Sequence, residues 1–132
     1  MQDGRPLSVV DDQVGAPTWA RNVAEVTAQI MAQGRAMGDD WLQEKGGTYH
    51  VTASGRCSWY DFAREILTAA HGPEYEPGLS PVPSSEYPTK ARRPPESVLD
   101  CSGLMDHFGL ALTDWSESLA RVMEEVPASA KA

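Results

Sequence analysis

The chain has 132 residues, of which 41% are hydrophobic and 23% charged, a balance typical of one folded globular domain. Its net charge of −8 argues against a nucleic-acid-binding protein, which needs a basic face for phosphate contacts. No apolar run approaches the roughly 18 residues of a membrane span, and the N-terminus has no signal-peptide core, so we expect a cytoplasmic protein without a membrane partner.

The first predicted elements are a strand and a helix. Residues 7–10 (LSVV) are short, apolar and β-branched, which predicts a strand. From residue 20, apolar residues recur at helical spacing, which predicts a helix that Thr18 caps and that ends near Gly34. Residues 34–47 are polar and contain glycines, and we expect them to form a surface connection.

A second strand and a second helix follow. Residues 48–53 (TYHVTA) alternate between two faces, with Tyr49, Val51 and Ala53 on one of them. Ser58 is predicted to cap a helix, with Asp61 three residues later in a capping-box position. Gly72 is predicted to end this helix.

The remaining third of the chain is less regular. Prolines in residues 73–95 exclude a central strand or a helix interior. Residues 98–99 are predicted to form a short strand, and Asp100 or Ser102 to open a short helix. Thr113 is predicted to cap the last helix, and residues 127–132 are expected to be a frayed tail.

This order of elements predicts an α/β protein. Two or three short strands, however, make too small a sheet for about four helices. The chain is therefore expected to be part of a larger fold.

Most familiar sites are excluded by the sequence. His50, Ser58 and Asp61 lie close in the chain, but Ser58 is better explained as a helix cap, and no GxSxG nucleophile motif is present. Cys57 and Cys101 have no CxxC or zinc spacing and are interpreted as reduced thiols. No GxGxxG or Walker loop occurs. We therefore expect no catalytic triad, no metal ligand set, and no dinucleotide or nucleoside triphosphate held in the usual backbone cradle.

Two stretches remain as candidate binding sites. In residues 11–18, two acids and a glutamine precede a sharp turn and the N-terminus of a helix. The free N–H groups of this N-terminus could face an anion or a partner chain. The alternative is a plain strand–turn–helix connection without a ligand. In residues 86–97, Arg92 and Arg93 lie in a proline-stiffened loop with Tyr87. That combination suits a nucleotide diphosphate, and the alternative is a solvated basic loop.

Four blocks occur in one order: VVDDQVGAPTWARNVA, GTYHVTASGRCSWYDFAREIL, YPTKARRPPESVLDCSGL and FGLALTDWSESLARVMEE. Together they closely resemble the C-terminal part of dTDP-4-dehydrorhamnose reductase, an extended short-chain dehydrogenase/reductase, over residues 5–126. The resemblance implies part of a Rossmann-like α/β fold with few short strands. It also implies reduction of dTDP-4-dehydro-L-rhamnose to dTDP-L-rhamnose, a step in the synthesis of nucleotide sugars and cell-surface polysaccharides.

Members of this family carry an N-terminal Rossmann domain that binds NADPH or NADH, and they use a Thr/Ser with a Tyr-x-x-x-Lys pair. This chain has no Tyr-x-x-x-Lys and no glycine-rich cofactor loop. The resemblance therefore implies that residues 1–126 are the substrate-binding part alone. We expect this part to bind no cofactor, to be inactive by itself and to have the missing Rossmann half as its partner, against which its own apolar face would pack.

The resemblance also implies where the dTDP-sugar substrate binds. Residues 13–18 would lie near the domain junction, and residues 87–93 near the nucleotide. The candidate substrate-binding residues are Gln13, Gly15, Pro17, Thr18, Tyr87, Arg92 and Arg93.

Some bacterial members dimerise around Mg²⁺ through two acidic residues. The second position matches Glu125, but the first is occupied here by Arg21, a cation that opposes a metal. We therefore expect no magnesium-linked dimer, while a homo-oligomer of another kind stays open. The regulatory β subunit of methionine adenosyltransferase shares the fold, so a non-catalytic module that binds a sugar nucleotide or a protein is the alternative function.

Overall fold

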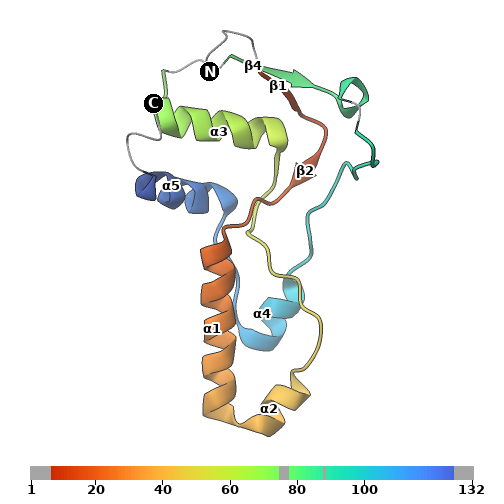
Figure 1. Cartoon of the computed structure of the whole chain (residues 1–132). Helices are drawn as coiled ribbons and strands as arrows, with labels where there is room; N and C mark the ends of the chain where they lie inside the picture. The colour runs from red at the N-terminus through yellow and green to blue at the C-terminus, as the bar shows by residue number, and fades with distance from the viewer. Residues whose placement is uncertain (1–6, 75–77, 88, 127–132) are drawn as a thin grey trace.

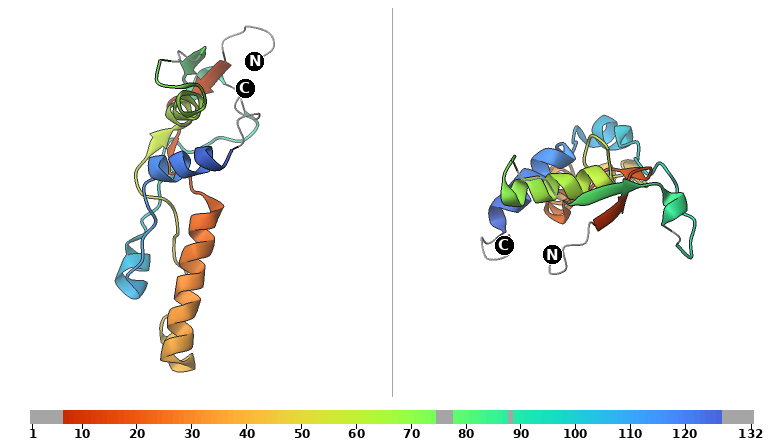
Figure 2. Two further views of the ribbon diagram at one scale, coloured as in Figure 1. Left: turned by 90° about the vertical axis from the view of Figure 1, so that its left-hand side faces the viewer. Right: turned by 90° about the horizontal axis from the view of Figure 1, so that it is seen from above.

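The computed structural model describes residues 7–74, 78–87 and 89–126. In chain order its elements are β1 (Leu7–Val10), β2 (Val14–Gly15), α1 (Ala20–Met37), α2 (Asp39–Glu44), β3 (Cys57–Ser58), α3 (Trp59–His71), β4 (Leu79–Val82), the 3₁₀ helix η1 (Ser84–Glu86), α4 (Ser102–Phe108) and α5 (Trp115–Glu125). The strands, α3 and α5 form one end, called the sheet end below, and α1 runs away from it toward α2 and α4 (Figure 1). Figure 2 shows the same arm of helices, with α4 beside the far half of α1.

The main strand pair joins two distant parts of the chain. β1 pairs in parallel with β4, in a register that runs from Leu7 opposite Leu79 to Val10 opposite Val82. The helix α3 packs against both strands. Pro81 in β4 has no N–H to donate, which suits a strand at the edge of a sheet. The proline-rich region is thus no central strand, but it does contain an edge strand that the sequence pattern did not indicate.

A second, smaller pair fixes the turn after β1. β2 pairs antiparallel with β3, so that Val14 lies opposite Ser58 and Gly15 opposite Cys57. Val14 also forms a parallel bridge with Glu96. The two residues of β2 are therefore held between two other segments of the chain.

The core lies in the arm of helices. Its buried cluster consists of Val26 of α1, Leu104 and Phe108 of α4, and Leu112. Leu104 is only 1% exposed. The whole chain has an accessible surface of 9250 Å², whereas a compact monomer of 14.3 kDa is expected to expose about 6,800 Å². The fold is therefore unusually open for its mass.

Several local predictions are confirmed. The strand β1 has the predicted bounds, and α3 begins with the predicted capping box: Asp61 N–H donates to Ser58 Oγ (3.0 Å) and Ser58 N–H to Asp61 Oδ2 (3.3 Å). Gly72 ends α3 with φ of 100°. The short helix after Asp100 is α4. These features depend on neighbouring residues, which the sequence displays directly.

Two predicted strands are wrong. Residues 48–53 and 98–99 form no strand. The alternation in the first segment is real, since Tyr49 and Val51 pack on the core cluster and Ala53 is 4% exposed. It arises because this segment lies against helices α1 and α4, and not because it pairs in a sheet.

The predicted surface connection at residues 34–47 is mostly exposed, but it is largely helical and not an irregular loop. α1 continues to Met37, and α2 follows after Gly38, whose φ of 97° turns the chain. The ring of Trp41 packs edge-on against Phe108, with centroids 5.8 Å apart. This contact anchors α2 to the core and gives a polar stretch a reason to fold as a helix.

Two predicted caps are shifted by one residue. Trp19, and not Thr18, is the N-cap residue of α1, and no side chain caps it. Asp114, and not Thr113, caps α5, where its carboxylate accepts from Ser116 N–H at 2.8 Å. The Thr18 hydroxyl instead donates to Ala16 O and accepts from Ala53 N–H. The predicted tail at residues 127–132 lies outside the described residues.

Candidate functional site

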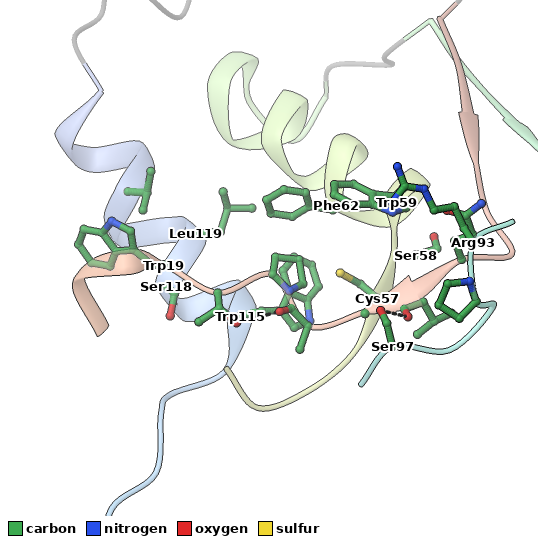
Figure 3. A pocket seen from close by; sticks show the side chains of 18 residues that line it. Trp19, Cys57, Ser58, Trp59, Phe62, Arg93, Ser97, Trp115, Ser118 and Leu119 are labelled. Carbon is green, nitrogen blue, oxygen red and sulfur yellow. Dashed lines mark hydrogen bonds between the residues drawn. The ribbon is translucent and has the colours of Figure 1, made fainter. Parts of the chain in front are cut away.

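A cavity of about 600 Å³ opens at the sheet end, beside β2. This volume lies within the usual range of small-molecule sites. The turn of residues 13–19, the start of α3, one face of α5 and residues 93–97 surround it (Figure 3). Its large side chains are Trp19, Trp59, Phe62, Trp115, Leu119 and Val122. The walls are therefore mainly apolar and aromatic.

Hydrogen bonds to β2 bring the arginine-bearing segment to the cavity. Val14 N–H donates to Pro95 O (2.8 Å), and Ser97 N–H donates to Val14 O (2.9 Å). A Cβ atom on Gly15 would lie 2.9 Å from Ser97 Oγ, so this close approach favours glycine. Because Arg93 lies two residues before Pro95, this pairing brings it to the cavity, where it is one of the lining residues.

Thr18 holds the turn together. Its Oγ1 donates to Ala16 O (2.9 Å) and accepts from Ala53 N–H (3.1 Å). The hydroxyl proton is thus used inside the protein, although the side chain borders the cavity. Any ligand contact by Thr18 would have to use the remaining lone pair or the methyl group.

Gln13 is similarly engaged. Its Nε2 donates to Ser84 Oγ (2.8 Å), and its backbone O accepts from Trp59 N–H (3.3 Å). In this orientation the amide oxygen and the second N–H of Nε2 are left for a ligand. Gln13 therefore combines a structural role with a place in the cavity wall.

The structure brings most of the sequence-predicted residues together. Five of them line the cavity: Gln13, Gly15, Pro17, Thr18 and Arg93. The other two, Tyr87 and Arg92, are exposed and do not line it. Contact of any of the seven with a substrate stays a prediction.

Sequence reasoning missed the aromatic wall. The helical spacing of Trp59, Phe62 and Trp115 is typical of buried side chains, but Trp59 is 58% exposed. The Phe62 ring packs edge-on between the other two, at centroid distances of 6.5 and 6.0 Å. The sequence signal for an exposed aromatic ring was a tryptophan at the first position of a helix, next to a turn.

The two loop arginines differ from the other arginines near the site. Arg56 pairs with Glu96, and Arg64 pairs with Asp61 at 3.3 Å. Arg92 and Arg93 form no ion pair or hydrogen bond with any described residue. One side of the cavity therefore carries positive charge that is available to an anion.

No nucleophile is formed at this site among the described residues. Cys57 is 8% exposed, and burial, followed by the nearby carboxylates of Asp61 and Asp114, raises its pKa to about 11. The Ser58 hydroxyl donates to Asp61 (2.8 Å), and a ring nitrogen of His50 contacts Asp100 O (3.3 Å). The described residues contain no His50–Ser58 hydrogen bond, so the rejected triad is not assembled.

The described residues do not fit a nicotinamide dinucleotide. β3 leads directly into α3, and at that helix N-terminus the Ser58 hydroxyl accepts from Asp61 N–H while the Asp61 carboxylate accepts from Ser58 N–H. A carboxylate at that helix N-terminus opposes a pyrophosphate. No step of chemistry is therefore assigned to a cofactor held by this chain.

Within residues 7–74, 78–87 and 89–126, no three His, Cys, Asp or Glu side chains gather as a metal site. Arg21 forms an ion pair with Glu125, the acid that the resemblance suggested as a metal ligand. None of the described helices has the length and apolar character to cross a membrane.

Comparison with known proteins identifies relatives of this chain. The dTDP-4-dehydrorhamnose reductase of Burkholderia thailandensis is 39% identical over 117 residues, which cover 83% of this chain and 38% of that protein. The same enzyme of Escherichia coli K12 is 36% identical, over 91% of this chain and 40% of that protein. The chain thus spans about 40% of the length of the curated relatives it matches.

Solved structures agree with this relationship. The crystal structure of dTDP-4-dehydrorhamnose reductase from Bacillus anthracis, in complex with NADP, matches with a TM-score of 0.77 and 28% identity, over 95% of this chain and 40% of that one. The resemblance and the α/β fold class drawn from the sequence are confirmed. The family model described as the RmlD substrate binding domain matches residues 1–127, and the chain belongs to that family.

Proposed function

We propose that this chain is the substrate-binding part of a dTDP-4-dehydrorhamnose reductase and that the cavity beside β2 binds the dTDP-sugar. Reduction of dTDP-4-dehydro-L-rhamnose to dTDP-L-rhamnose needs a hydride donor. A partner Rossmann part would supply NADPH or NADH together with the proton-transfer residues. This chain would supply the substrate-binding surface.

The observation that carries the proposal is the combination of aromatic walls with a cationic edge. In Figure 3, Trp19 and Leu119 lie toward one end of the cavity, and Trp59 and Arg93 toward the other. A dTDP-sugar has flat base and sugar faces, which pack on aromatic rings, and a diphosphate, which guanidinium groups bind through paired hydrogen bonds. The unpaired Arg93 provides such a group at the edge of an apolar cavity.

The open architecture supports the requirement for a second part. Parallel sheets normally have several strands and are covered on both faces, whereas β1 and β4 form a two-stranded sheet in the described residues. The chain also exposes about 2,400 Å² more surface than a compact monomer of its mass. Additional strands beside the β1–β4 pair would account for both features.

Calorimetry with dTDP tests the proposed site. Arg93→Ala is expected to weaken dTDP binding by roughly 1.5–3 kcal/mol, because a charge-assisted hydrogen bond is lost. Arg92→Ala is expected to have a smaller effect, since Arg92 does not line the cavity. Arg35→Ala is the matched control, because Arg35 lies in the last turn of α1, far along the arm. Unchanged dTDP affinity in Arg93→Ala would remove this cavity as the nucleotide site.

An activity assay tests the division of labour. With dTDP-4-dehydro-L-rhamnose and NADPH, the chain alone is expected to leave the NADPH absorbance unchanged. NADPH oxidation by the purified chain would contradict the proposal. Binding of dTDP without reduction, even after a family cofactor domain is joined to the chain, would favour the non-catalytic module instead.

A further inference from the structure

Asp12 and Ser84 are joined across 72 residues of sequence. The two carboxylate oxygens of Asp12 accept from Ser84 N–H at 3.0 and 2.9 Å, and Oδ1 also accepts from the Ser84 hydroxyl at 2.6 Å. The hydroxyl in turn accepts from Gln13 Nε2 at 2.8 Å. The backbone N–H and the hydroxyl of Ser84 are thus both bound by the residues that follow β1.

This contact replaces a missing cap. Ser84 is the first residue of η1, and the N-cap residue Pro83 offers no side-chain hydrogen bond. Asp12 accepts from the free N–H group at the start of η1, as a capping side chain does. A residue outside the local sequence therefore fixes where η1 begins.

The same short segment also holds the chain after η1. Val14 N–H donates to Pro95 O at 2.8 Å, and Val14 O accepts from Ser97 N–H at 2.9 Å. Residues 12–14 therefore bind the chain on both sides of residues 89–94, called the arginine loop here. These loop residues are all exposed, and one internal hydrogen bond, from Thr89 Oγ1 to Ala91 O (2.7 Å), lies within the loop.

We propose that Asp12 is a positioning residue that acts through Ser84 to fix the arginine loop, and with it Arg93, at the edge of the cavity. The choice of a nucleotide diphosphate as ligand rests on the proposed function above. Asp12 does not line the cavity, and its carboxylate is occupied by Ser84. Its effect on the ligand is therefore indirect.

The first arm of the test is amide hydrogen exchange on the chain without ligand. Asp12→Asn keeps the size of the side chain but removes its charge and one acceptor. The amides of Ser84, Glu86 and Tyr87 are expected to exchange roughly fivefold faster or more, while the Ser97 amide, at the other end of the loop, keeps its rate. Asp11→Asn is the control.

The Asp11→Asn control is closely matched. Asp11 is exposed and adjacent, and its side chain makes no hydrogen bond with the described residues. The substitution therefore removes an equal charge without touching Ser84. Equal exchange rates at Ser84, Glu86 and Tyr87 in the two variants would overturn the proposal.

The second arm is dTDP affinity in a double-mutant cycle. Asp12→Asn is expected to weaken dTDP binding several-fold and Asp11→Asn to leave it unchanged. In the Arg93→Ala background, Asp12→Asn should add little further loss, because Asp12 acts through Arg93. Losses that simply add would overturn the positioning role. Wild-type chain that binds no dTDP would refute the proposed function, while the exchange rates would still decide whether Asp12 orders η1, the segment that leads into the loop.

Discussion

The N–H of Ala53 donates a hydrogen bond to the hydroxyl of Thr18 at 3.1 Å, and this bond joins the turn after β2 to the segment that precedes β3. Ala53 is 4% exposed, so water cannot readily replace the hydroxyl. Thr18 is thus a structural residue of the cavity wall, whatever its contact with a ligand.

Thr18→Val tests this bond. Valine keeps the shape of threonine but leaves the buried Ala53 N–H without an acceptor, which is expected to lower the free energy of unfolding by about 1–3 kcal/mol. Thr27→Val is the control, since the exposed Thr27 hydroxyl donates to Val23 O within its own helix α1. Urea unfolding measures both variants, and equal stability of the two would show that the Thr18–Ala53 bond is unimportant.

Gly15→Ala tests the close approach of Ser97. The added Cβ would meet Ser97 Oγ at 2.9 Å and displace it from its hydrogen bond to Val14 O. A loss of about 0.5–1.5 kcal/mol in the free energy of unfolding is expected. In a Ser97→Ala background the same glycine substitution should cost less, because the colliding oxygen is gone. An equal cost in both backgrounds, measured by urea unfolding, would place the strain elsewhere.

The pH dependence of stability reports on Asp12. Hydrogen bonds from the Ser84 side chain, and then from its backbone, lower the pKa of Asp12 below its ordinary value of 3.8. A lowered folded-state pKa means that the ionised form stabilises the fold. This contribution is present above pH 3.8 and is lost as the pH falls through the lowered pKa.

Urea midpoints of wild type and Asp12→Asn, measured from neutral pH downward, check this sign. The wild type should be the more stable at neutral pH, and the gap should close in acid below pH 3.8. Asp11→Asn should show no comparable gap. A difference between wild type and Asp12→Asn that stays constant into strong acid would contradict the assigned role of the carboxylate.

Cys57 is expected to be a slow thiol. Because burial raises its pKa from 9.0 to about 11, little thiolate exists near neutral pH. In a Cys101→Ser variant, alkylation by iodoacetamide should accelerate roughly tenfold per pH unit between about pH 8 and pH 10. A rate that levels off near pH 9.0, the ordinary thiol value, would show that the cavity wall does not desolvate Cys57.

The sequence predicts local structure well because the deciding residues are neighbours. The Ser58–Asp61 capping box and the stop at Gly72 each need only a few adjacent positions. It predicts strand pairing poorly, because pairing depends on distant partners. Residues 48–53 alternate like a strand yet pack on helices. β4 forms a strand because it pairs with β1, whose residues lie 72 positions earlier in the chain.

The candidate site shows the same division. Gln13, Thr18 and Arg93 belong to recognisable motifs, and the structure brings them to one cavity. The aromatic wall was hidden because an exposed tryptophan and a buried one have the same spacing on a helix. The contact of Asp12 with Ser84 also lay beyond sequence reasoning, since each residue alone resembles an ordinary turn residue.

The central claim is that the cavity beside β2 binds a thymidine nucleotide, and the four tryptophans of the chain offer the most direct test. Trp19, Trp59 and Trp115 line the cavity, whereas Trp41 packs on Phe108 in the arm. The measurement is the shift of the indole N–H resonances during an NMR titration with dTDP, which also detects weak binding. Shifts of the cavity tryptophans with Trp41 unchanged are predicted. Four unchanged resonances, or a shift confined to Trp41, would contradict the account.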